Sequence, residues 1–255
     1  MAPVRRPLQG TLNVVRFNWP FYAAAAAGAL AAEVVVRLAP KRVRPLVRAA
    51  QFVGLTAAVA SLAVTYRVYD ASGYYRLSWL ADALAASGFR APAPMRLLNV
   101  NAGFDELTAL LRERYPSAEV VPVDFYDPAR HTEPSISRAR AAYPPPTDTV
   151  TLRHPAEVSR LGPADLLLAA LSAHEIRDEA ERIDFFTRLR VRLRPGGRIV
   201  IVEHLRDLPN ALAYTLGVGH FHTRATWQRT FDGAGLRVLD ERSHTPWLRV
   251  ITLAV

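Results

Sequence analysis

Short apolar runs alternate with longer segments of helical spacing between residues 96 and 204. The runs are continuous and rich in branched aliphatic residues, which is typical of strands covered by helices on both faces. Five strands are predicted, over Leu97–Asn101, Glu119–Phe125, Asp148–Leu152, Asp165–Leu171 and Arg198–His204. Helices are predicted between them, over Asp105–Tyr115, Pro128–Tyr143, Ala156–Arg160 and His174–Leu193. Such a series of units predicts an α/β fold with a parallel, doubly wound sheet and right-handed crossovers.

The end of the chain departs from this alternation. An irregular stretch to His222 precedes a predicted helix over Thr223–Gly233 and two predicted strands, Leu236–Arg242 and Trp247–Val255. Only S-H-T-P separates these strands, and so short a connection joins antiparallel neighbours. The sequence therefore predicts five parallel strands and a terminal antiparallel hairpin. A dinucleotide-dependent oxidoreductase would have a sixth parallel strand instead, so the hairpin disfavours that function.

A longer block links the fourth and fifth predicted strands. It reads L-S-A-H-E-I-R-D-E-A-E-R-I-D-F-F-T-R-L-R-V-R-L-R-P-G-G-R-I-V-I-V-E-H, residues 171–204. This block resembles class I S-adenosylmethionine-dependent methyltransferases, close to the branch that methylates quinone and lipid precursors, such as those of ubiquinone and menaquinone. The resemblance covers residues 95–255. It implies a Rossmann-like fold, S-adenosylmethionine as cofactor, and methyl transfer to an unidentified small-molecule acceptor.

The loop after the first strand departs from the family pattern, in which an acidic residue precedes alternate glycines. Asn99 stands at the position of the acid, Asn101 and Asp105 stand at two of the glycine positions, and Gly103 is retained. Glycine allows a positive φ or a close backbone approach. Asp105 either accepts the ammonium group of the methionine moiety or caps its own helix. The resemblance implies cofactor contacts from Asn99, Asn101, Ala102, Gly103 and Asp105.

A carboxylate ends the second predicted strand, in V-P-V-D-F-Y-D-P. Asp124 resembles the family residue that hydrogen-bonds both ribose hydroxyls, because two carboxylate oxygens match a vicinal diol. Phe125 follows it. Ser172 and Ala173 come directly after the fourth strand, at the same edge of the sheet. These residues complete the predicted cofactor contacts.

Two polar clusters follow the fourth and fifth strands, where ligands of open α/β sheets bind. Methyl transfer needs an in-line nucleophile and in some cases a base. His174, Glu203 and His204 are therefore the predicted catalytic residues. In the structural alternative, His174 caps its helix and Glu203 pairs with Arg177 or Arg206.

The segment G-H-F-H-T supplies two further histidines. His220 and His222, together with Arg206, are predicted to contact the substrate. The apolar insert 209–219 lies where the family commonly builds a substrate lid, which favours a lipophilic acceptor.

Metal binding is the alternative use of these histidines. The chain has no cysteine, which excludes disulfides, thiolate zinc sites and cysteine nucleophiles, so any metal needs histidine and carboxylate ligands. Spacing without an H-x-x-x-H signature is weak evidence for a metal, and no metal site is assigned from the sequence. The available ligands are His174, Glu175, Glu203, His204, His220 and His222.

A basic cluster surrounds the second predicted helix. It consists of Arg130, His131, Arg138 and Arg140. The cluster is either a solvated helix face or an anion pocket for a phosphorylated or carboxylated acceptor.

Two apolar stretches, Pro20–Val36 and Ala49–Val64, precede the α/β region. Each is slightly shorter than the roughly 20 residues of a bilayer crossing, and alanine contributes little transfer energy. The connecting loop Arg37–Arg48 carries five cations, which a membrane hairpin with a cytoplasmic domain would place outside, against the positive-inside tendency. The alternatives are a membrane hairpin, an interfacial helix pair and two soluble helices packed on the domain. Membrane contact through residues 20–66, with the domain in the cytoplasm, is favoured.

Charge supports this reading. The net charge is +9, and residues 1–48 hold eight basic side chains against Glu33 alone, whereas residues 96–255 are nearly balanced. Apolar runs rather than interleaved aromatics flank the basic region, which favours an anionic membrane surface over nucleic acid. The predicted organisation is a helical segment over 1–86, a linker over 87–95 and a methyltransferase-like domain over 96–255. The competing function is a catalytically silent binding module, because the first loop lacks two of the family's glycines and its first acid.

Overall fold

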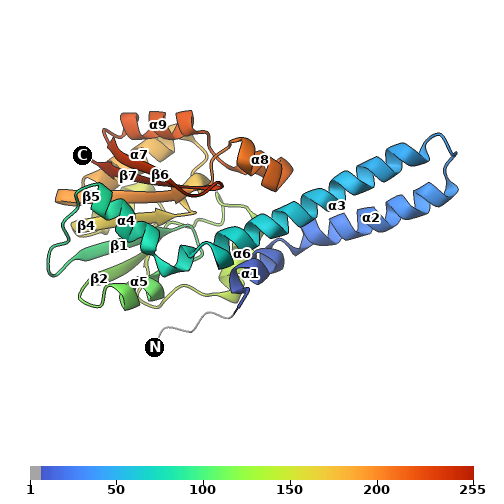
Figure 1. Cartoon of the computed structure of the whole chain (residues 1–255). Coiled ribbons are helices and arrows are strands. Elements are labelled where there is room, and N and C mark those ends of the chain that lie inside the picture. Colours follow the sequence, from blue (N-terminus) through green and yellow to red (C-terminus); the bar gives the residue numbers. More distant parts are fainter. Residues whose placement is uncertain (1–6) are drawn as a thin grey trace.

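A seven-stranded sheet lies at the centre of the α/β domain, and a long helical hairpin projects from one side of it (Figure 1). The structure, a computed structural model, describes residues 7–255 except for the side chain of Leu216. The strand order is β3-β2-β1-β4-β5-β7-β6. β7 pairs antiparallel with both β5 and β6, and the other pairs are parallel. The predicted architecture of five parallel strands with a terminal antiparallel hairpin is confirmed.

The elements have the following bounds. The strands are β1 (Arg96–Asn101), β2 (Glu119–Asp124), β3 (Val150–Thr151), β4 (Ala164–Ala170), β5 (Leu193–Glu203), β6 (Arg237–Thr245) and β7 (Leu248–Ala254). The α-helices are α1 (Gln9–Phe17), α2 (Trp19–Leu38), α3 (Arg44–Tyr66), α4 (Ser78–Ala86), α5 (Thr108–Arg114), α6 (Pro134–Ala142), α7 (Glu179–Arg190), α8 (Leu208–Tyr214) and α9 (Arg224–Gly233). Short helical turns are η1 (Arg67–Ala71), η2 (Tyr74–Arg76), η3 (Pro155–Arg160), η4 (Ala173–Glu175) and η5 (Thr215–His220).

Several helices begin later than the sequence predicts, because local capping sets their first turns. The Asp105 carboxylate accepts a hydrogen bond from Thr108 N, so α5 begins at Thr108. Proline starts α6 at residue 134, since its missing N–H is not needed in a first turn. Asp178 accepts a hydrogen bond from Glu181 N and caps α7, which begins at Glu179. His174, where this helix was predicted to begin, therefore lies outside it. The stretch before His222 that was predicted to be irregular contains α8 and η5 instead.

Side chains of the strands pack into two hydrophobic layers, one on each face of the sheet. Leu98, Val100 and Ile201 pack toward α7 and α9, whereas their neighbours Leu97 and Val200 pack toward α4 and α5. Successive strand residues point to opposite faces, so both faces need apolar residues and the runs are continuous. α4 contributes the buried Trp79 and Leu80 to the second layer. The folded core therefore includes residues that precede the predicted linker.

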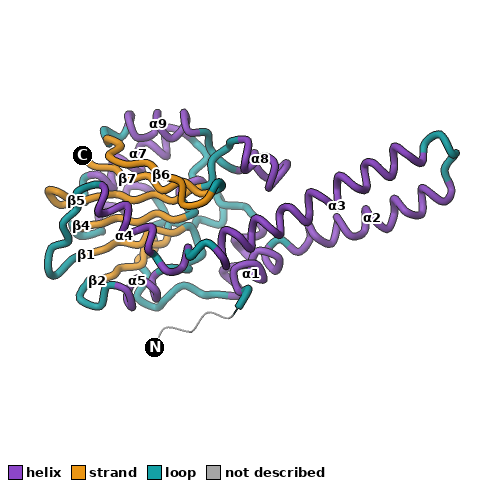
Figure 2. The backbone as a smooth tube through the Cα atoms, in the orientation of Figure 1, coloured by secondary structure: helices purple, strands orange, loops and turns teal. Residues whose placement is uncertain are grey.

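The hairpin of α2 and α3 leaves the domain as two antiparallel helices (Figure 2). Trp19–Leu38 and Arg44–Arg76 are long and apolar enough to cross a membrane, by length and composition, and only 6% of each apolar window is buried. Small residues line the space between the helices, among them Gly28 and Gly54. Large apolar side chains such as Phe52, which is 71% exposed, point outward. The two helices are thus not packed on the domain along their length.

α1 ties the base of the hairpin to the domain. Asp70, in η1, accepts hydrogen bonds from Gly10 N at 3.0 Å, Thr11 N at 2.8 Å and Thr11 Oγ1 at 2.6 Å. In the middle of α1, Asn13 Oδ1 accepts a hydrogen bond from the phenol of Tyr143 at 2.9 Å. These contacts hold α1 across the edge of the sheet.

Replacement of Asp70 by alanine is expected to release α1. The three hydrogen bonds to one carboxylate are together worth about 2 kcal/mol of docking free energy, which corresponds to a roughly thirty-fold loss of protection. Native-state hydrogen exchange of the amides in 10–17 measures the effect. Asp184→Ala, which removes an exposed partner of Arg188, is the matched control and leaves these amides unchanged. Unchanged exchange in Asp70→Ala would show that α1 docks without this carboxylate.

Candidate functional site

A cavity of about 190 Å³ lies where β1 and β4 end, beneath α1. β1 pairs with β2 on one side and with β4 on the other, so this is the point at which the strand order reverses and at which open α/β sheets bind ligands. Five of the predicted cofactor residues line the cavity: Asn99, Asn101, Ala102, Asp105 and Ser172. Within residues 7–255, the remaining predicted cofactor residues Gly103, Asp124, Phe125 and Ala173 lie outside its wall.

The loop after β1 is held by its own side chains. Gly103 has a φ of +96°, and a Cβ there would lie 3.0 Å from Ile136 and Tyr126, so both the conformation and the packing require glycine. Asn101 Oδ1 accepts from Gly103 N at 3.1 Å. Asp105 Oδ1 caps α5 and also accepts from Asn99 Nδ2 at 3.0 Å.

Two buried polar atoms of this loop have no hydrogen-bond partner within the described residues. They are Asn101 Nδ2 and Asp105 Oδ2, and both residues line the cavity. A donor and a charged acceptor left unpaired in a buried site are costly unless a ligand satisfies them. Two side chains in the wall of the cavity thus hold one unpaired donor and one unpaired anionic acceptor.

Asp124 is completely buried beside this loop. Its Oδ1 accepts from Tyr126 N at 2.9 Å, and its Oδ2 forms an ion pair with Arg140. The Arg140 guanidinium also lies 4.6 Å from the centroid of the Tyr126 ring. Arg140 therefore occupies Oδ2 of Asp124, and its Nη1 also lies 3.4 Å from the Gly103 carbonyl oxygen.

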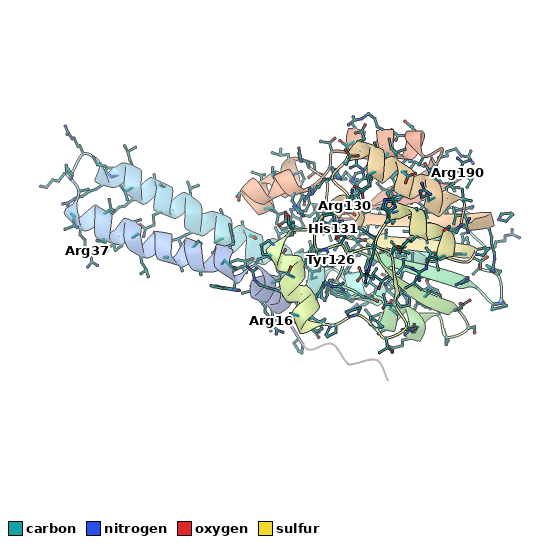
Figure 3. All side chains as sticks on the ribbon, turned by 180° about the vertical axis from the view of Figure 1, so that it is seen from behind. Arg16, Arg37, Tyr126, Arg130, His131 and Arg190 are labelled. Carbon is teal, nitrogen blue, oxygen red and sulfur yellow. The ribbon has the colours of Figure 1, made fainter. Side chains whose placement is uncertain are left out.

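The four basic side chains around α6 have different partners, and two of them, Arg130 and His131, line one small cavity together with Arg153 and His154. Arg130 pairs with Glu181, Arg138 donates to the Phe17 carbonyl and Arg140 pairs with Asp124. His131 Nδ1 accepts from Asp127 N at 2.9 Å, and burial lowers the pKa of His131. Figure 3 shows Arg130 and His131 on the domain, away from the tip of the hairpin. The side chains of this cluster thus form individual ion pairs and hydrogen bonds, and the Arg130 side chain remains 44% exposed.

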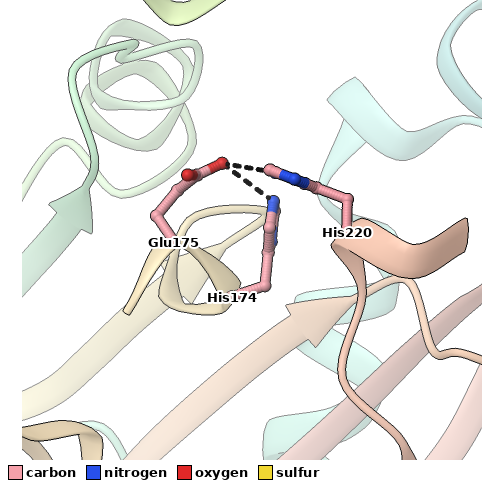
Figure 4. Close-up of side chains that lie close together, drawn as sticks. All are labelled: His174, Glu175 and His220. Carbon is pink, nitrogen blue, oxygen red and sulfur yellow. Dashed lines mark hydrogen bonds and ion pairs between the residues drawn. The ribbon is translucent and has the colours of Figure 1, made fainter. Parts of the chain in front are cut away.

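A cluster of histidines and glutamates lies next to the cavity (Figure 4). His174 Nε2 and His220 Nε2 lie 3.3 Å and 3.0 Å from Glu175 Oε1. On its other side, His174 Nδ1 lies 2.6 Å from Glu203 Oε2, and Glu203 is fully buried. The predicted meeting of the two strand-end clusters is thus seen for His174 and Glu203, and Glu203 pairs with His174 rather than with Arg177 or Arg206.

This arrangement stabilises charge on both partners. Burial alone would lower the pKa of His174, but the Glu203 charge and hydrogen bonds to Glu175 and Glu203 outweigh burial and raise it to about 10. Burial alone would raise the pKa of Glu175, but hydrogen bonds from His174 and His220 lower it far below its usual range. Glu175 also lines the cavity, so the cluster reaches the cavity through this carboxylate.

Three other predicted site residues have protein partners away from the cavity. His204 Nδ1 lies 2.9 Å from the Trp247 carbonyl, and the ring stacks on Phe221. Arg206 donates to the carbonyls of Phe221 and Gly219 and so holds the segment that carries His220. His222 Nε2 lies 3.1 Å from Arg182 Nη1, and burial with the Arg182 charge lowers its pKa to about 4. Arg206 and His222 thus have protein partners in this structure, and their predicted substrate contact stays a prediction.

The N-terminal segment supplies cavity residues that the sequence did not indicate. Asn13 and Phe17 come from α1, and Tyr69 and Tyr75 follow the hairpin. The Tyr75 phenol donates to Glu106 Oε1 at 2.7 Å. The aromatic residues between 65 and 80 are the sequence signal for this wall, because Tyr69, Tyr74 and Tyr75 lie among them and line the cavity. These aromatic residues form part of the cavity wall only because the chain returns from the hairpin to the domain at this point.

Comparisons with known proteins identify solved structures that have a similar fold. No family model matches the sequence, and no curated protein matches it. A solved S-adenosylmethionine-dependent methyltransferase from Clostridium acetobutylicum is 12% identical, aligns over 78% of this chain and 99% of its own, and has a TM-score of 0.51. An O-methyltransferase family 2 protein from Planctomyces limnophilus, solved in complex with apigenin, is 18% identical over 84% of this chain and 69% of its own, with a TM-score of 0.47.

A third solved structure is a pericyclic reaction enzyme with 13% identity and a TM-score of 0.48, aligned over 68% of this chain. The chain spans about half of its length, 46%. Identities this low establish architecture rather than activity. Together with the strand order, the comparison with the clostridial protein shows that this chain has the Rossmann-like fold of class I methyltransferases, with an added N-terminal helical segment.

Proposed function

We propose that the chain is a membrane-associated, S-adenosylmethionine-dependent methyltransferase that acts on a lipophilic small molecule. The observation that carries the proposal is the pair of unsatisfied polar atoms, Asn101 Nδ2 and Asp105 Oδ2, in the cavity at the switch point of the sheet. The membership in a quinone- or lipid-precursor branch, implied by residues 171–204, is part of the same proposal.

The residues fit the amino-acid end of the cofactor. The methionine moiety carries an ammonium donor and a carboxylate acceptor. Asp105 Oδ2 would accept from the ammonium group while Oδ1 continues to cap α5, and Asn101 Nδ2 would donate to the carboxylate. The two roles considered for Asp105 are therefore compatible, because each uses a different oxygen.

A contact between Asp124 and the ribose of the cofactor requires the Arg140 side chain to move. Asp124 can accept from a vicinal diol only after Arg140 leaves its Oδ2, and the Arg140 side chain is 27% exposed, so it has a path to solvent. The cavity of about 190 Å³ is smaller than the roughly 300–1,000 Å³ of typical ligand sites. Displacement of Arg140 would extend the cavity toward Asp124.

The position of the hairpin supports a lipophilic acceptor. Phe17 of α1, Tyr69 of η1 and Tyr75 of η2 line the cavity, and both α1 and η1 contact α3 at the base of the hairpin. An acceptor dissolved in a membrane around the hairpin would reach this wall without crossing bulk water. His174 and Glu203 would act through Glu175, the member of their cluster that lines the cavity.

Isothermal titration of the full chain with S-adenosylhomocysteine tests the cofactor assignment. We expect binding by the wild type and a roughly ten- to hundred-fold loss in Asp124→Asn, because a charged hydrogen-bond acceptor is removed. Arg140→Gln is expected to bind at least as tightly as the wild type, since it frees Asp124. Asp148→Asn, which changes an exposed carboxylate paired with Arg112, is the control. Absence of binding by both the folded wild type and Arg140→Gln would favour the catalytically silent module.

Vesicle flotation tests the membrane assignment separately. The wild type is expected to float with vesicles that contain anionic lipid, because apolar hairpin faces and the basic connecting loop both favour them. The double variant Phe52→Asp/Val59→Asp should lose most of this binding. Val191→Asp/Val255→Asp, at exposed apolar positions of the domain, is the matched control. Equal flotation of both double variants would contradict insertion through the hairpin.

A further inference from the structure

We propose that His174, Glu175 and His220 form a binding site for one divalent first-row transition metal ion. Each residue offers one ligand atom, and the three atoms all lie within 4.8 Å of one another. His174 and Glu175 belong to η4, whereas His220 ends η5 in the long connection after β5 (Figure 4). The site is assigned by this convergence and does not depend on the proposed methyl transfer.

The ligand spacing matches an ion's coordination shell. Metal bonds to histidine nitrogen and carboxylate oxygen are about 2.0–2.2 Å long, which places adjacent ligand atoms about 2.9–3.5 Å apart in octahedral or tetrahedral geometry. The two spacings to Glu175 Oε1 are 3.3 Å from His174 Nε2 and 3.0 Å from His220 Nε2. An ion can therefore bind with small side-chain adjustments and with release of the proton that His174 Nε2 shares with Glu175, so binding is expected to weaken as the pH falls.

The surroundings orient the ligands as in known metal sites. Histidine ligands usually donate their second ring N–H to a carboxylate, which fixes the tautomer. His174 Nδ1 lies 2.6 Å from the buried Glu203 Oε2, so Nε2 is the nitrogen that faces Glu175. His220 Nδ1 lies 3.3 Å from Glu133 Oε1. Arg177 contacts the same nitrogen and also donates to the His220 carbonyl. Metal binding requires Arg177 to give up its contact with Nδ1, while its hydrogen bond to the carbonyl can remain.

The chemistry of the donors selects the ion. Two imidazoles and one carboxylate suit Zn²⁺, Fe²⁺ and related ions better than Ca²⁺ or Mg²⁺, which prefer oxygen ligands. Three protein ligands leave coordination positions open. Since Glu175 lines the cavity, these positions face it, and a hydroxyl or carbonyl oxygen of a molecule in the cavity is the expected additional ligand.

Titration of the chelator-treated full chain with Co²⁺ tests the site, with visible absorption and competition by Zn²⁺ as readouts and without any sulfonium cofactor. We expect one ion per chain. His220→Ala and Glu175→Gln should weaken binding at least a hundred-fold, and Glu203→Gln about ten- to hundred-fold through the orientation of His174. His154→Ala, which removes an exposed histidine outside the cluster, should bind as the wild type does.

The proposal is overturned if the wild type binds no stoichiometric ion, or if His220→Ala binds as tightly as the wild type. His220 is partly exposed, so its replacement tests the site even if variants of the buried His174 do not fold. Circular dichroism confirms folding of each variant. Because only metal binding is measured, this result is separate from the cofactor titration.

Discussion

Arg182→Ala is expected to lower the free energy of unfolding by about 3 kcal/mol. Arg182 is 1% exposed and is held inside the domain by specific partners. Its guanidinium donates to Thr230 Oγ1 at 2.9 Å and to the Ile176 carbonyl at 2.8 Å, and it lies 5.7 Å from the Trp227 ring centroid. Removal leaves buried acceptors unsatisfied and a cavity beside the ring, and each effect costs more than one kcal/mol in typical cores.

Urea unfolding of the wild type and the variant measures this difference. Arg188→Ala, on the same helix but exposed and paired with Asp184, should cost less than about 0.5 kcal/mol. The Ile176 carbonyl follows Glu175 in the chain, so Arg182→Ala should also weaken Co²⁺ binding. A loss of stability no larger than that of Arg188→Ala would show that the buried guanidinium contributes no net stability.

Acid is expected to destabilise the fold through His204. Burial lowers the pKa of His204 to about 4, despite its hydrogen bond to the Trp247 carbonyl. The unfolded chain binds this proton near pH 6.5, so between pH 6.5 and 4 the unfolded state holds more protons than the folded state. Stability therefore falls as the pH falls through this range, by roughly 3 kcal/mol for this group at pH 4.

The variant His204→Gln isolates the effect, because the glutamine amide can still donate to the Trp247 carbonyl but does not titrate. Its free energy of unfolding should decline less steeply than that of the wild type between pH 6.5 and 4. His222 contributes in the same direction, since its pKa is also lowered to about 4, so part of the decline remains. Parallel pH profiles for the two proteins would show that His204 is already charged in the folded state above pH 4.

The architecture was predictable because the strands carry their own signal. Leu97 and Leu98 pack into different hydrophobic layers, and a strand covered on both faces must be apolar at successive positions. The short connection before β7 likewise indicates an antiparallel pair. Helix starts were less predictable, since Asp105 and Asp178 cap helices that begin three and one residues after them.

The sequence by itself determined the order of strands and helices, the antiparallel end and the apolar character of the hairpin, because periodicity, composition and turn length act between neighbours in the chain. Only the tertiary structure decided which side chains meet. Arg140 fills the space beside Asp124 from α6, and His220 reaches His174 and Glu175 from a separate connection. Such pairings depend on how the helices pack across the edge of the sheet. The residues that meet there come from segments far apart in the sequence, and the periodicity within one segment does not indicate its distant partner.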